Sequence, residues 1–476
     1  MFSIKNIIIA GIVGCAMCAT TSCRENEYGT VDLTLPEEQE VKATYTFTGV
    51  TGLYSDADFD RVKNALDNNT APAEVVQEFN NLKNSNYASK SYTPTPQNKI
   101  VRGDISGTGE STQTYTYAMK DAAAAYQQAL LWKLTGDNGY AATATNILTA
   151  WAGKCTAITS NDADFNLAAG AQGFTFALAG QMLMSYDGWD ADQKTAFKTW
   201  MKNVFATVNK EFLTNHAKGT SFHNSHKNVP QAVWDEHYWS NWDMVTLTSY
   251  LAIGILCEDN DMVNYVVNYF YSGVGNGNIN KLIRGTHTDP LGSGETICQN
   301  QESGRDQGHA QMSTMVCGTL CQLAYSLYRQ NPSVEKLDFF AANNNAVLHM
   351  AEYVALSNLR DGTDRRNATG VFLVTAATMP FTEYHHCPGA SSAGDDNLHT
   401  QMTEEQASGK PRTGETRPGW EIFLAHYKDL GTGYKYVKQM ADKIRPEGGA
   451  GEQENRYGDN SGAFDQLGWN TLMLYQ

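Results

Sequence analysis

Helix-length apolar runs follow one another along most of this chain and restrict it to helical folds. The run at 119–135 contains four consecutive alanines and an Ala-Leu-Leu-Trp stretch, and it stops at Gly136, a residue type that commonly ends helices. Strand-like patterns are confined to 44–47 and 370–374. Further helical runs stand at 140–151, 165–184, 190–205, 234–257, 262–271, 307–328, 337–356, 420–427 and 434–444. The sequence therefore predicts an all-α protein.

Most of these runs are joined by short connections, and they lack a heptad repeat. Helix pairs of this kind favour an (α/α) toroid or barrel of helix hairpins over a coiled coil. Three long polar segments, 273–302, 380–418 and 447–465, interrupt the helices. Loops of this length are usually functional or disordered, and clustered His, Tyr, Arg and Gly residues favour function. We expect active-site loops there.

The first 22 residues have the features of an export signal. Lys5 precedes an apolar run at 7–19 that is too short to span a bilayer as a stable helix. The run ends Ala-Thr-Thr-Ser-Cys23, which resembles a bacterial lipobox with Cys23 as the acylated residue. Thr20 stands where that motif usually has Leu, so a plain secreted form is the alternative. We expect an exported protein that is lipid-anchored at the bacterial outer membrane or in the periplasm.

Downstream of the signal, residues 23–50 are polar and aperiodic and predict a tether. No Pro/Ser-rich linker divides residues 51–476. We therefore expect one large domain that carries the function, with the lipid as its sole contact with a membrane.

The charge balance is acidic, with 35 basic against 51 acidic residues and a formal net charge of −16. Such a chain repels polyanions, so nucleic acid and anionic membranes are disfavoured as partners. If the ligand is itself an anion, its positive contacts must be concentrated locally. The nine Trp and 24 Tyr supply aromatic planes that suit sugar faces, although most of them are expected to fill the core.

The cysteines do not form a disulfide scaffold. Of the nine cysteines, three belong to the signal or to the lipid site. The other six are scattered over a chain that is large enough to fold without disulfide bonds. Cys317 and Cys321, one helical turn apart, are predicted to be core residues. A bridge involving Cys298 or Cys387 is left open.

Polar side chains gather at 299–312, directly ahead of a long apolar run. If the helix extends back through this segment at about 100° per residue, Glu302, Arg305 and His309 fall within roughly 60° of one another. Charged groups on a core-facing stripe are costly unless they are paired or line a wet cavity. The same arc continues with Val316, Leu320, Leu323 and Leu327. The segment therefore predicts a functional site.

The run at 234–257 repeats this arrangement. His237 and Asn241 lie one turn apart, on the arc that later carries apolar residues. Alone, the pair is readily explained by the capping of buried carbonyls, but two such helices together favour a shared cleft. A third candidate is the loop that contains His385 and His386; because adjacent side chains diverge, we expect at most one of the two to face the site.

Metal and nucleophile chemistry lack their usual motifs. His223 and His226 offer two imidazoles, but no third ligand stands at a familiar spacing, and neither HExxH nor a paired CxxC is present. The sequence also lacks a GxSxG elbow and a P-loop. We expect neither a metal nor another cofactor, and we expect both histidines in a solvated loop or on the substrate side.

Four stretches resemble the alginate lyase group of α/α-toroid polysaccharide lyases, and together they span about residues 115–476. Residues 121–137 resemble its early helix hairpin, and 445–468 resemble its C-terminal segment. The two most specific stretches, His237-Tyr-Trp-Ser-Asn-Trp-Asp243 and Glu302-Ser-Gly-Arg-Asp-Gln-Gly-His309, resemble its two active-site helices.

The resemblance implies β-elimination across a uronic acid 1,4-linkage in an anionic polysaccharide, with alginate as the first candidate and glucuronan as another. The C5 proton is weakly acidic while the neighbouring group remains a carboxylate. A lyase must therefore neutralise or hydrogen-bond that carboxylate. A base then takes the proton, and an acid protonates the leaving oxygen.

The same resemblance assigns roles to individual residues. Asn241 and Arg305 are expected to neutralise and bind the carboxylate, and Glu302 is expected to orient Arg305 or to join them. His237 is the expected base by its position, and His309 is a second base or a sugar-binding residue.

The acid should be a tyrosine, and here the sequence departs from the family pattern. Better-known toroid lyases have a Tyr about two turns after the Arg, whereas Met312 occupies that place. Tyr384 or Tyr238 must then supply the phenol. The side chains expected to bind substrate are Glu302, Tyr238, Trp242, His385 and Gln301.

Two other functions are left open. An inverting glycoside hydrolase on a similar barrel needs two facing carboxylates; Glu302 could be one, with Asp243, Asp306 or Asp396 as the other. The second alternative is a non-catalytic, glycan-binding surface lipoprotein, which fits the Trp content but fits inward-facing Arg and His less well.

Overall fold

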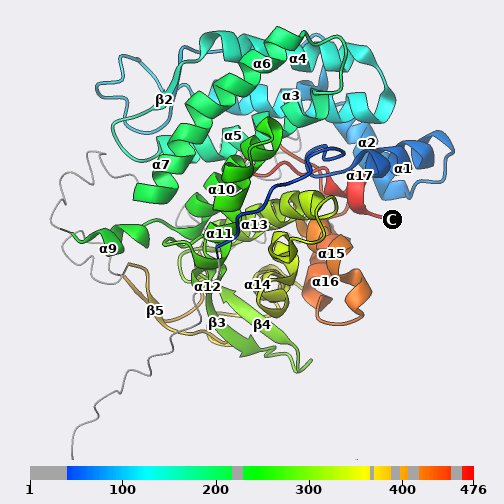
Figure 1. The fold of residues 1–476 in the computed structure, drawn as a ribbon. Coiled ribbons are helices and arrows are strands. Elements are labelled where there is room, and N and C mark those ends of the chain that lie inside the picture. The colour runs from blue at the N-terminus through cyan, green and yellow to red at the C-terminus, as the bar shows by residue number, and fades with distance from the viewer. Residues whose placement is uncertain (1–39, 217–228, 365–368, 388–396, 406–416, 452–463) are drawn as a thin grey trace, which may run out of the picture. The chain divides into compact units, whose positions relative to one another are not determined.

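Helices occupy the apolar runs of the sequence in the computed structural model (Figure 1). The structure describes residues 40–216, 229–364, 369–387, 397–405, 417–451 and 464–476. The helices there are α1 (Asp56–Asp67), α2 (Ala73–Lys83), α3 (Tyr115–Thr135), α4 (Asn138–Lys154), α5 (Phe165–Leu183), α6 (Ala191–Trp200), α7 (Thr207–Asn215), α9 (Gln231–Asp235), α10 (Ser240–Cys257), α11 (Asn260–Ser272), α12 (Ile279–Leu282), α13 (Gln307–Tyr328), α14 (Ala342–Asn358), α15 (Trp420–Tyr427), α16 (Lys435–Ile444) and α17 (Asn470–Leu474). A π-helical turn, Met201–Ala206, joins α6 to α7. The predicted all-α class is confirmed.

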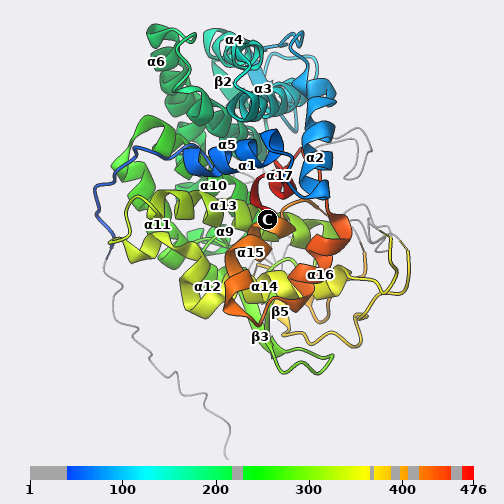
Figure 2. The ribbon, with the colours of Figure 1, turned by 90° about the vertical axis from the view of Figure 1, so that its right-hand side faces the viewer.

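The long helices pack as a series of hairpins. α3, α5, α10 and α13 are buried along most of their length, and α10 lies between α5 and α13. Three of them are followed by a partner that packs against them: α4 on α3, α11 on α10 and α14 on α13. Such pairing agrees with the expected (α/α) toroid. Near the C-terminus, α17 packs against α1, α2 and α15 (Figures 1 and 2).

Close approach of α5 and α10 depends on a small residue. A Cβ at Gly170 of α5 would lie 2.6 Å from the Cγ2 atom of Val245 on α10. Because Gly170 has no side chain, the Val245 side chain of α10 can pack directly against the backbone of α5. Because Asn241 lies in the first turn of α10, this contact also fixes the position of Asn241.

Three two-stranded sheets occur among the described residues: β1 (Lys99–Val101) with β2 (Ala157–Thr159), β3 (Ile283–Thr288) with β4 (Thr296–Asn300), and β5 (Tyr384–His385) with β6 (Leu398–His399). The strands predicted at 44–47 and 370–374 are wrong, since the first is extended without a strand partner and the second contains an isolated bridge. The β3–β4 hairpin was missed within the loop at 273–302. Gln299 and Asn300 of β4 are buried although polar, so no apolar alternation marks this strand.

Two helix boundaries differ from the prediction in a way that matters for the site. The run at 234–257 is not one helix, because α9 ends at Asp235 and α10 begins at Ser240. Likewise α13 begins at Gln307, with Asp306 in an extended conformation (φ −169°, ψ 159°) as its N-cap. Glu302 and Arg305 therefore precede the helix in a turn, and they do not share a helical face with His309, contrary to the prediction.

Among the described residues, the six cysteines carry free thiols. Cys317 and Cys321 are buried, as predicted, and neither Cys298 nor Cys387 forms a bridge. None of the helices in the described ranges has the length and apolarity needed to cross a membrane. Residues 1–22, Cys23, His223, His226 and Asp396 lie outside the described residues.

Candidate active site

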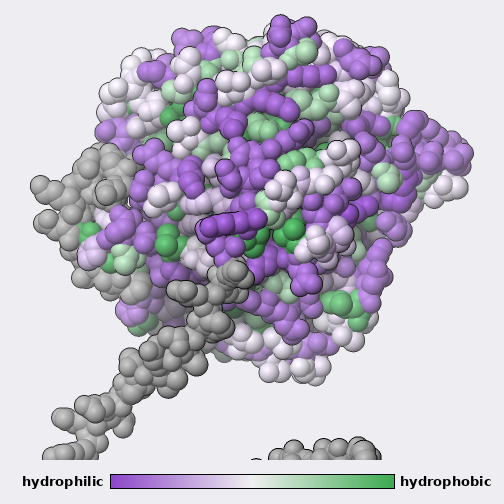
Figure 3. Space-filling model, viewed as in Figure 1, coloured by the Kyte–Doolittle hydropathy of each residue, from purple (hydrophilic) through white to green (hydrophobic). Residues whose placement is uncertain are grey.

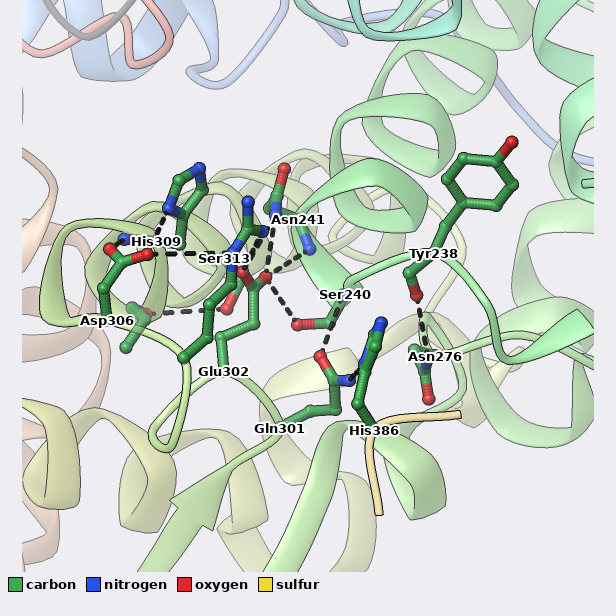
Figure 4. A network of polar contacts seen from close by, with 12 residues as sticks. Tyr238, Ser240, Asn241, Asn276, Gln301, Glu302, Asp306, His309, Ser313 and His386 are labelled. Atoms are coloured by element: carbon green, nitrogen blue, oxygen red, sulfur yellow. Dashed lines mark hydrogen bonds and ion pairs between the residues drawn. The ribbon is translucent and has the colours of Figure 1, made fainter. Parts of the chain in front are cut away.

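The carboxylate of Glu302 is the centre of a buried polar network between the start of α10 and the start of α13 (Figure 4). Its Oε1 accepts hydrogen bonds from the backbone N–H of Asn241 at 2.7 Å and from the Ser240 hydroxyl at 2.9 Å. The Nδ2 group of Asn241 donates to both carboxylate oxygens, at 3.0 and 2.9 Å, and Arg305 donates to Oε2 at 3.1 Å. The Glu302 side chain is 0% exposed. A buried carboxylate needs such complete pairing, so Glu302 holds Asn241 and Arg305 side by side.

This network also explains why α10 begins at Ser240. The Oε1 atom of Gln301 accepts the Ser240 N–H at 3.0 Å, and Glu302 accepts the next N–H along. The first N–H groups of a helix have no intrahelical acceptor, and the helix N-terminus favours negative charge. The turn at 301–302 therefore caps α10 with an amide and a carboxylate. His237 is left outside the helix, in the turn that follows α9.

The orientation of the Asn241 amide follows from its partners. Both Asn241 contacts with Glu302 use Nδ2 as the donor, so Oδ1 is directed the other way, as Figure 4 shows. An amide oxygen accepts hydrogen bonds and cannot donate them. The atom that Asn241 offers to a ligand therefore suits a hydroxyl group or a protonated carboxyl group.

Arg305 is held by three neighbours. Besides the bond to Glu302, its Nε lies 3.7 Å from Oδ2 of Asp306, and its guanidinium lies 4.8 Å from the centre of the Trp239 ring. That indole stacks on His386, with ring centres 3.5 Å apart and planes at 11°. The Arg305 side chain is still 25% exposed. A fixed and partly exposed guanidinium is a good partner for a carboxylate.

His309 and Asp306 form a dyad in the first turn of α13. The Nδ1 atom of His309 lies 2.7 Å from Oδ2 of Asp306, and its backbone N–H donates to Oδ1 at 2.8 Å. Burial alone would raise the pKa of Asp306, but the hydrogen bonds and charge of His309 and the charge of Arg305 bring that pKa below its ordinary value. An ionised Asp306 keeps the ring proton on Nδ1, which leaves the lone pair on Nε2. The His309 side chain is 24% exposed, so its geometry suits a base.

Of the adjacent histidines in the loop, one is buried in the network and the other is exposed, as expected for neighbouring side chains. His386 is buried, and its Nδ1 lies 3.4 Å from Nε2 of Gln301. Burial and the positive charges of His237, His399 and Arg305 lower the pKa of His386 to about 3, so the ring is neutral and packs against Trp239 without adding charge. His385 is exposed on β5. The structure thus brings His386, and not the predicted His385, into the network.

Tyr384 supports the turn that carries the network. Its hydroxyl donates to the backbone carbonyl of Gln301, and its ring stacks on His399 with centres 5.0 Å apart. Burial raises the pKa of this phenol above its ordinary value. In this position the hydroxyl braces the Gln301 carbonyl, and the role of Tyr384 as the acid stays a prediction.

The remaining predicted residues form an aromatic wall beside the network. His237 packs edge-on against Trp234 and Tyr238, with ring centres 4.9 and 4.8 Å away, and Tyr238 lies 4.9 Å from Trp242. Figure 4 shows the Tyr238 ring directed away from Glu302 and His309. Its backbone carbonyl accepts a hydrogen bond from Asn276 at 2.8 Å.

Sequence reasoning missed Ser240 and Trp239 as members of the site, and it missed Asp306 as the partner of His309. Of the two loop histidines it selected His385, whereas His386 contacts the network. Asp306 did carry a signal, since an Asp directly before an apolar helical run is a typical N-cap. The contact between Trp239 and His386 joins segments far apart in the sequence, and neither segment has a pattern that points to the other.

Of the other carboxylates considered for a hydrolase, those that the structure describes already have hydrogen-bond or ion-pair partners. Asp243 is buried; it pairs with His216 at 3.3 Å and accepts the Gly277 N–H at 2.6 Å. Asp306 is bound to His309, and Glu302 is saturated by its donors. Within the described ranges, His, Cys, Asp and Glu side chains do not gather in groups of three or more that could hold a metal ion.

Comparisons with known proteins agree with the resemblance drawn from the motifs. Residues 71–282 match the family model described as alginate lyase. A variant of alginate lyase A1-III complexed with tetrasaccharide aligns at 13% identity over 92% of this chain and 98% of its own, with a TM-score of 0.50, which supports the fold.

Two further structures align less well. Alginate lyase A1-III from Sphingomonas species A1 aligns at 13% identity over 90% of this chain and 98% of its own, with a TM-score of 0.49. An alginate lyase from Bacteroides ovatus aligns at 10% identity over 82% and 96%, with a TM-score of 0.46. Comparison with curated proteins gives no match. The family match includes Asn241 and all of α10, so this part of the chain is similar to the alginate lyase family of polysaccharide lyases.

Proposed function

We propose that the protein cleaves a uronate-containing polysaccharide by β-elimination, with alginate as the first substrate to test and glucuronan as the second. The observation that carries this proposal is the Glu302 carboxylate, which holds an amide and a guanidinium side by side next to the His309–Asp306 dyad. These are the groups that removal of a proton next to a carboxylate requires. The tetrasaccharide complex of a structural neighbour supports a glycan as the ligand.

The first task of the site is to neutralise the substrate carboxylate. The exposed part of Arg305 binds this carboxylate and stabilises the charge that develops when the C5 proton leaves. Asn241 presents Oδ1, which accepts a hydrogen bond from the carboxyl group in its protonated form. Glu302 keeps both side chains in place and has no bonding capacity left for the substrate.

The second task is proton removal. In our proposal Nε2 of His309 takes the C5 proton, and Asp306 stabilises the imidazolium that results. The electron pair of the C5–H bond forms the C4–C5 double bond, and the C4–O4 bond breaks. Either the protonated His309 returns its proton to the leaving oxygen, or a phenol, that of Tyr384 or Tyr238, supplies the proton instead. His237 remains a second candidate base.

An inverting hydrolase is less well supported. That mechanism needs an acid and a base carboxylate about 6.5–9.5 Å apart with room for a water molecule. Glu302, Asp243 and Asp306 are each bound by neighbouring donors, and those bonds leave none of the three free to activate water.

The test is a panel of purified uronate polysaccharides, with the ultraviolet absorbance of the new double bond as the readout. We expect product from at least one polymer, and we expect Arg305→Ala and His309→Ala each to abolish it while the helical circular dichroism is unchanged. Arg329→Ala is a matched control, because Arg329 pairs with Asp58 at the partly exposed far end of α13. Near-wild-type turnover in Arg305→Ala would remove Arg305 from the mechanism. Retention of polymer without turnover would instead establish a binding protein.

We also propose that Cys23 is acylated and anchors the protein after export. The support is the lipobox-like sequence that precedes it. Incorporation of a labelled fatty acid that is lost in Cys23→Ser would support the anchor, whereas equal labelling of the variant would refute it.

A further inference from the structure

An extended segment at the start of the described chain is clamped onto α11 by asparagine side chains. We call residues 40–46 the strap. Asn264 accepts the Ala43 N–H at 3.0 Å and donates to the Ala43 carbonyl at 2.9 Å, and Asn268 makes the same pair of bonds with Val41 at 2.7 and 3.0 Å. Asn260, one turn earlier on α11, accepts the Tyr45 N–H at 2.8 Å. These three asparagines lie four residues apart, on one face of α11.

The strap forms one wall of a large hollow. The hollow has a volume of about 1050 Å³ and lies between the strap, α7, the end of α10 and α11. Figures 1 and 3 view the molecule from the side on which the strap crosses α11, and the surface there is mostly hydrophilic. A hollow of this size has room for sugar units of a bound glycan.

Aromatic rings line the hollow in a row. Tyr250 and Tyr265 have ring centres 5.6 Å apart, and Tyr265 and Tyr269 have centres 6.0 Å apart. Hydroxyl groups of Thr214 and Ser272 lie among them. Rings with polar edges bury the apolar face of a ligand and still reach its hydroxyls.

Lys210 completes the lining. The Nζ atom of Lys210 lies 2.9 Å from the centre of the Tyr265 ring and 6.0 Å from that of Tyr250. Burial lowers the pKa of Lys210 below its ordinary value. Among the described residues Lys210 forms no ion pair within 4.0 Å, and no acidic group contributes to the shift of its pKa. A partly buried cation of this kind gains most from an anionic partner.

We propose that this hollow is a second glycan site that binds an acidic sugar residue, with the carboxylate on Lys210 and the sugar face on the tyrosines. The inference rests on the proposed function only for the identity of the polymer. The hollow is linked to the catalytic network, because the Tyr269 hydroxyl donates to Asp243 at 3.3 Å, two residues after Asn241 on α10. A glycan held there keeps the enzyme on its polymer between cleavages.

Binding of a purified oligouronate, measured by calorimetry in the Arg305→Ala background to prevent turnover, tests this site. We expect Lys210→Met to weaken binding about tenfold, which corresponds to about 1.4 kcal/mol at 25 °C. Tyr265→Leu should weaken it similarly, so that the result does not depend on one variant folding. Lys438→Met is the matched control, since Lys438 pairs with Asp442 on α16, and it should bind like the background protein.

Equal affinity of the Lys210→Met variant and the background protein would overturn the proposal. So would equal affinity for a neutral oligosaccharide of the same length, because the lysine would then contribute nothing. If the wild-type protein forms no unsaturated product, the proposed function fails, but the calorimetric comparison still decides whether the second site exists.

Discussion

At the residue level, the pairing of His309 with Asp306 determines which imidazole nitrogen is available as a base. Asp306 serves two purposes, because one oxygen caps α13 and the other fixes the imidazole. Substitution by Asn retains the cap, since Asn and Asp cap helices about equally well, but it removes the negative charge that stabilises a protonated His309.

For Asp306→Asn we therefore expect kcat to fall about 10²-fold, with KM and the unfolding temperature close to those of the wild type. Initial rates of double-bond formation and a thermal melt measure these quantities. Asp190→Asn is the control, because Asp190 caps α6 away from the site, and it should leave kcat unchanged. Full activity of Asp306→Asn would show that His309 does not act as a proton carrier.

The residue types of the site were predictable from sequence, but their contacts were not. Asn241, Arg305 and Glu302 were singled out because polar groups on apolar helices are costly, and the structure does join them. The donor set around Glu302 could not be derived, since it joins a turn to a helix start 61 positions earlier in the chain. His237 was assigned to a helix face that does not exist, because Gln301 and Glu302 cap α10 after it.

At the scale of elements, a buried ion pair ties α7, α10 and α11 together behind the site. His216, which ends α7, lies 3.3 Å from Asp243 and from the hydroxyl of Tyr269. A Cβ at Gly275 would collide with all three side chains, so glycine is required where the loop after α11 passes over them. This cluster fixes the first turn of α10, and with it Asn241.

The same cluster predicts how stability depends on pH. Burial alone would lower the pKa of His216, but the charges of Asp243 and Asp235 and their hydrogen bonds outweigh it and raise that pKa to about 9. Because the folded pKa lies above the unfolded value of about 6.5, the stabilisation is complete below pH 6.5. It is lost as the pH rises through about 9.

We expect the free energy of unfolding to fall by up to roughly 3 kcal/mol across that interval, as measured by urea denaturation at several pH values. His216→Gln should be less stable at pH 6 and should lack this decline. His426→Gln is the control: burial lowers the pKa of His426 to about 4, so its contribution does not change above pH 6.5. An identical decline in His216→Gln would assign the effect to other groups.

Helix positions were the most predictable elements. The run at 307–328 coincides with α13 because a long apolar stretch meets an N-cap at one end and polar residues at the other. The β3–β4 hairpin escaped prediction because β4 buries polar as well as apolar side chains, for example Asn300, which donates to the Ser313 hydroxyl at 2.8 Å.

In the molecule as a whole, the extended strap is held by asparagine side chains that are distant in sequence, and not by a neighbouring β-strand. The strap is bound by asparagines of α11, and Asn331, after α13, makes a further pair of bonds to Thr46 at 2.7 and 2.9 Å. The sequence predicted a strand at 44–47 from its β-branched and aromatic residues. It could not reveal that the partners are side-chain amides more than 200 residues away.

Simultaneous Asn264→Ala and Asn268→Ala substitution removes four backbone contacts of the strap. We expect limited proteolysis to cut within residues 40–46 at least several-fold faster, while kcat on a short oligouronate is unchanged because the strap is not part of the Glu302 network. Asn161→Ala, on the loop after β2, controls for the loss of a surface amide. An unchanged cleavage rate would show that the asparagines do not hold the strap.

We expect this arrangement of side chains to cleave its substrate by elimination and not by hydrolysis. The most direct test is mass spectrometry of the products from an oligouronate of defined length. Elimination gives two fragments whose masses sum to that of the substrate, one of them carrying an ultraviolet-absorbing double bond. Fragments whose masses sum to that of the substrate plus one water would contradict it.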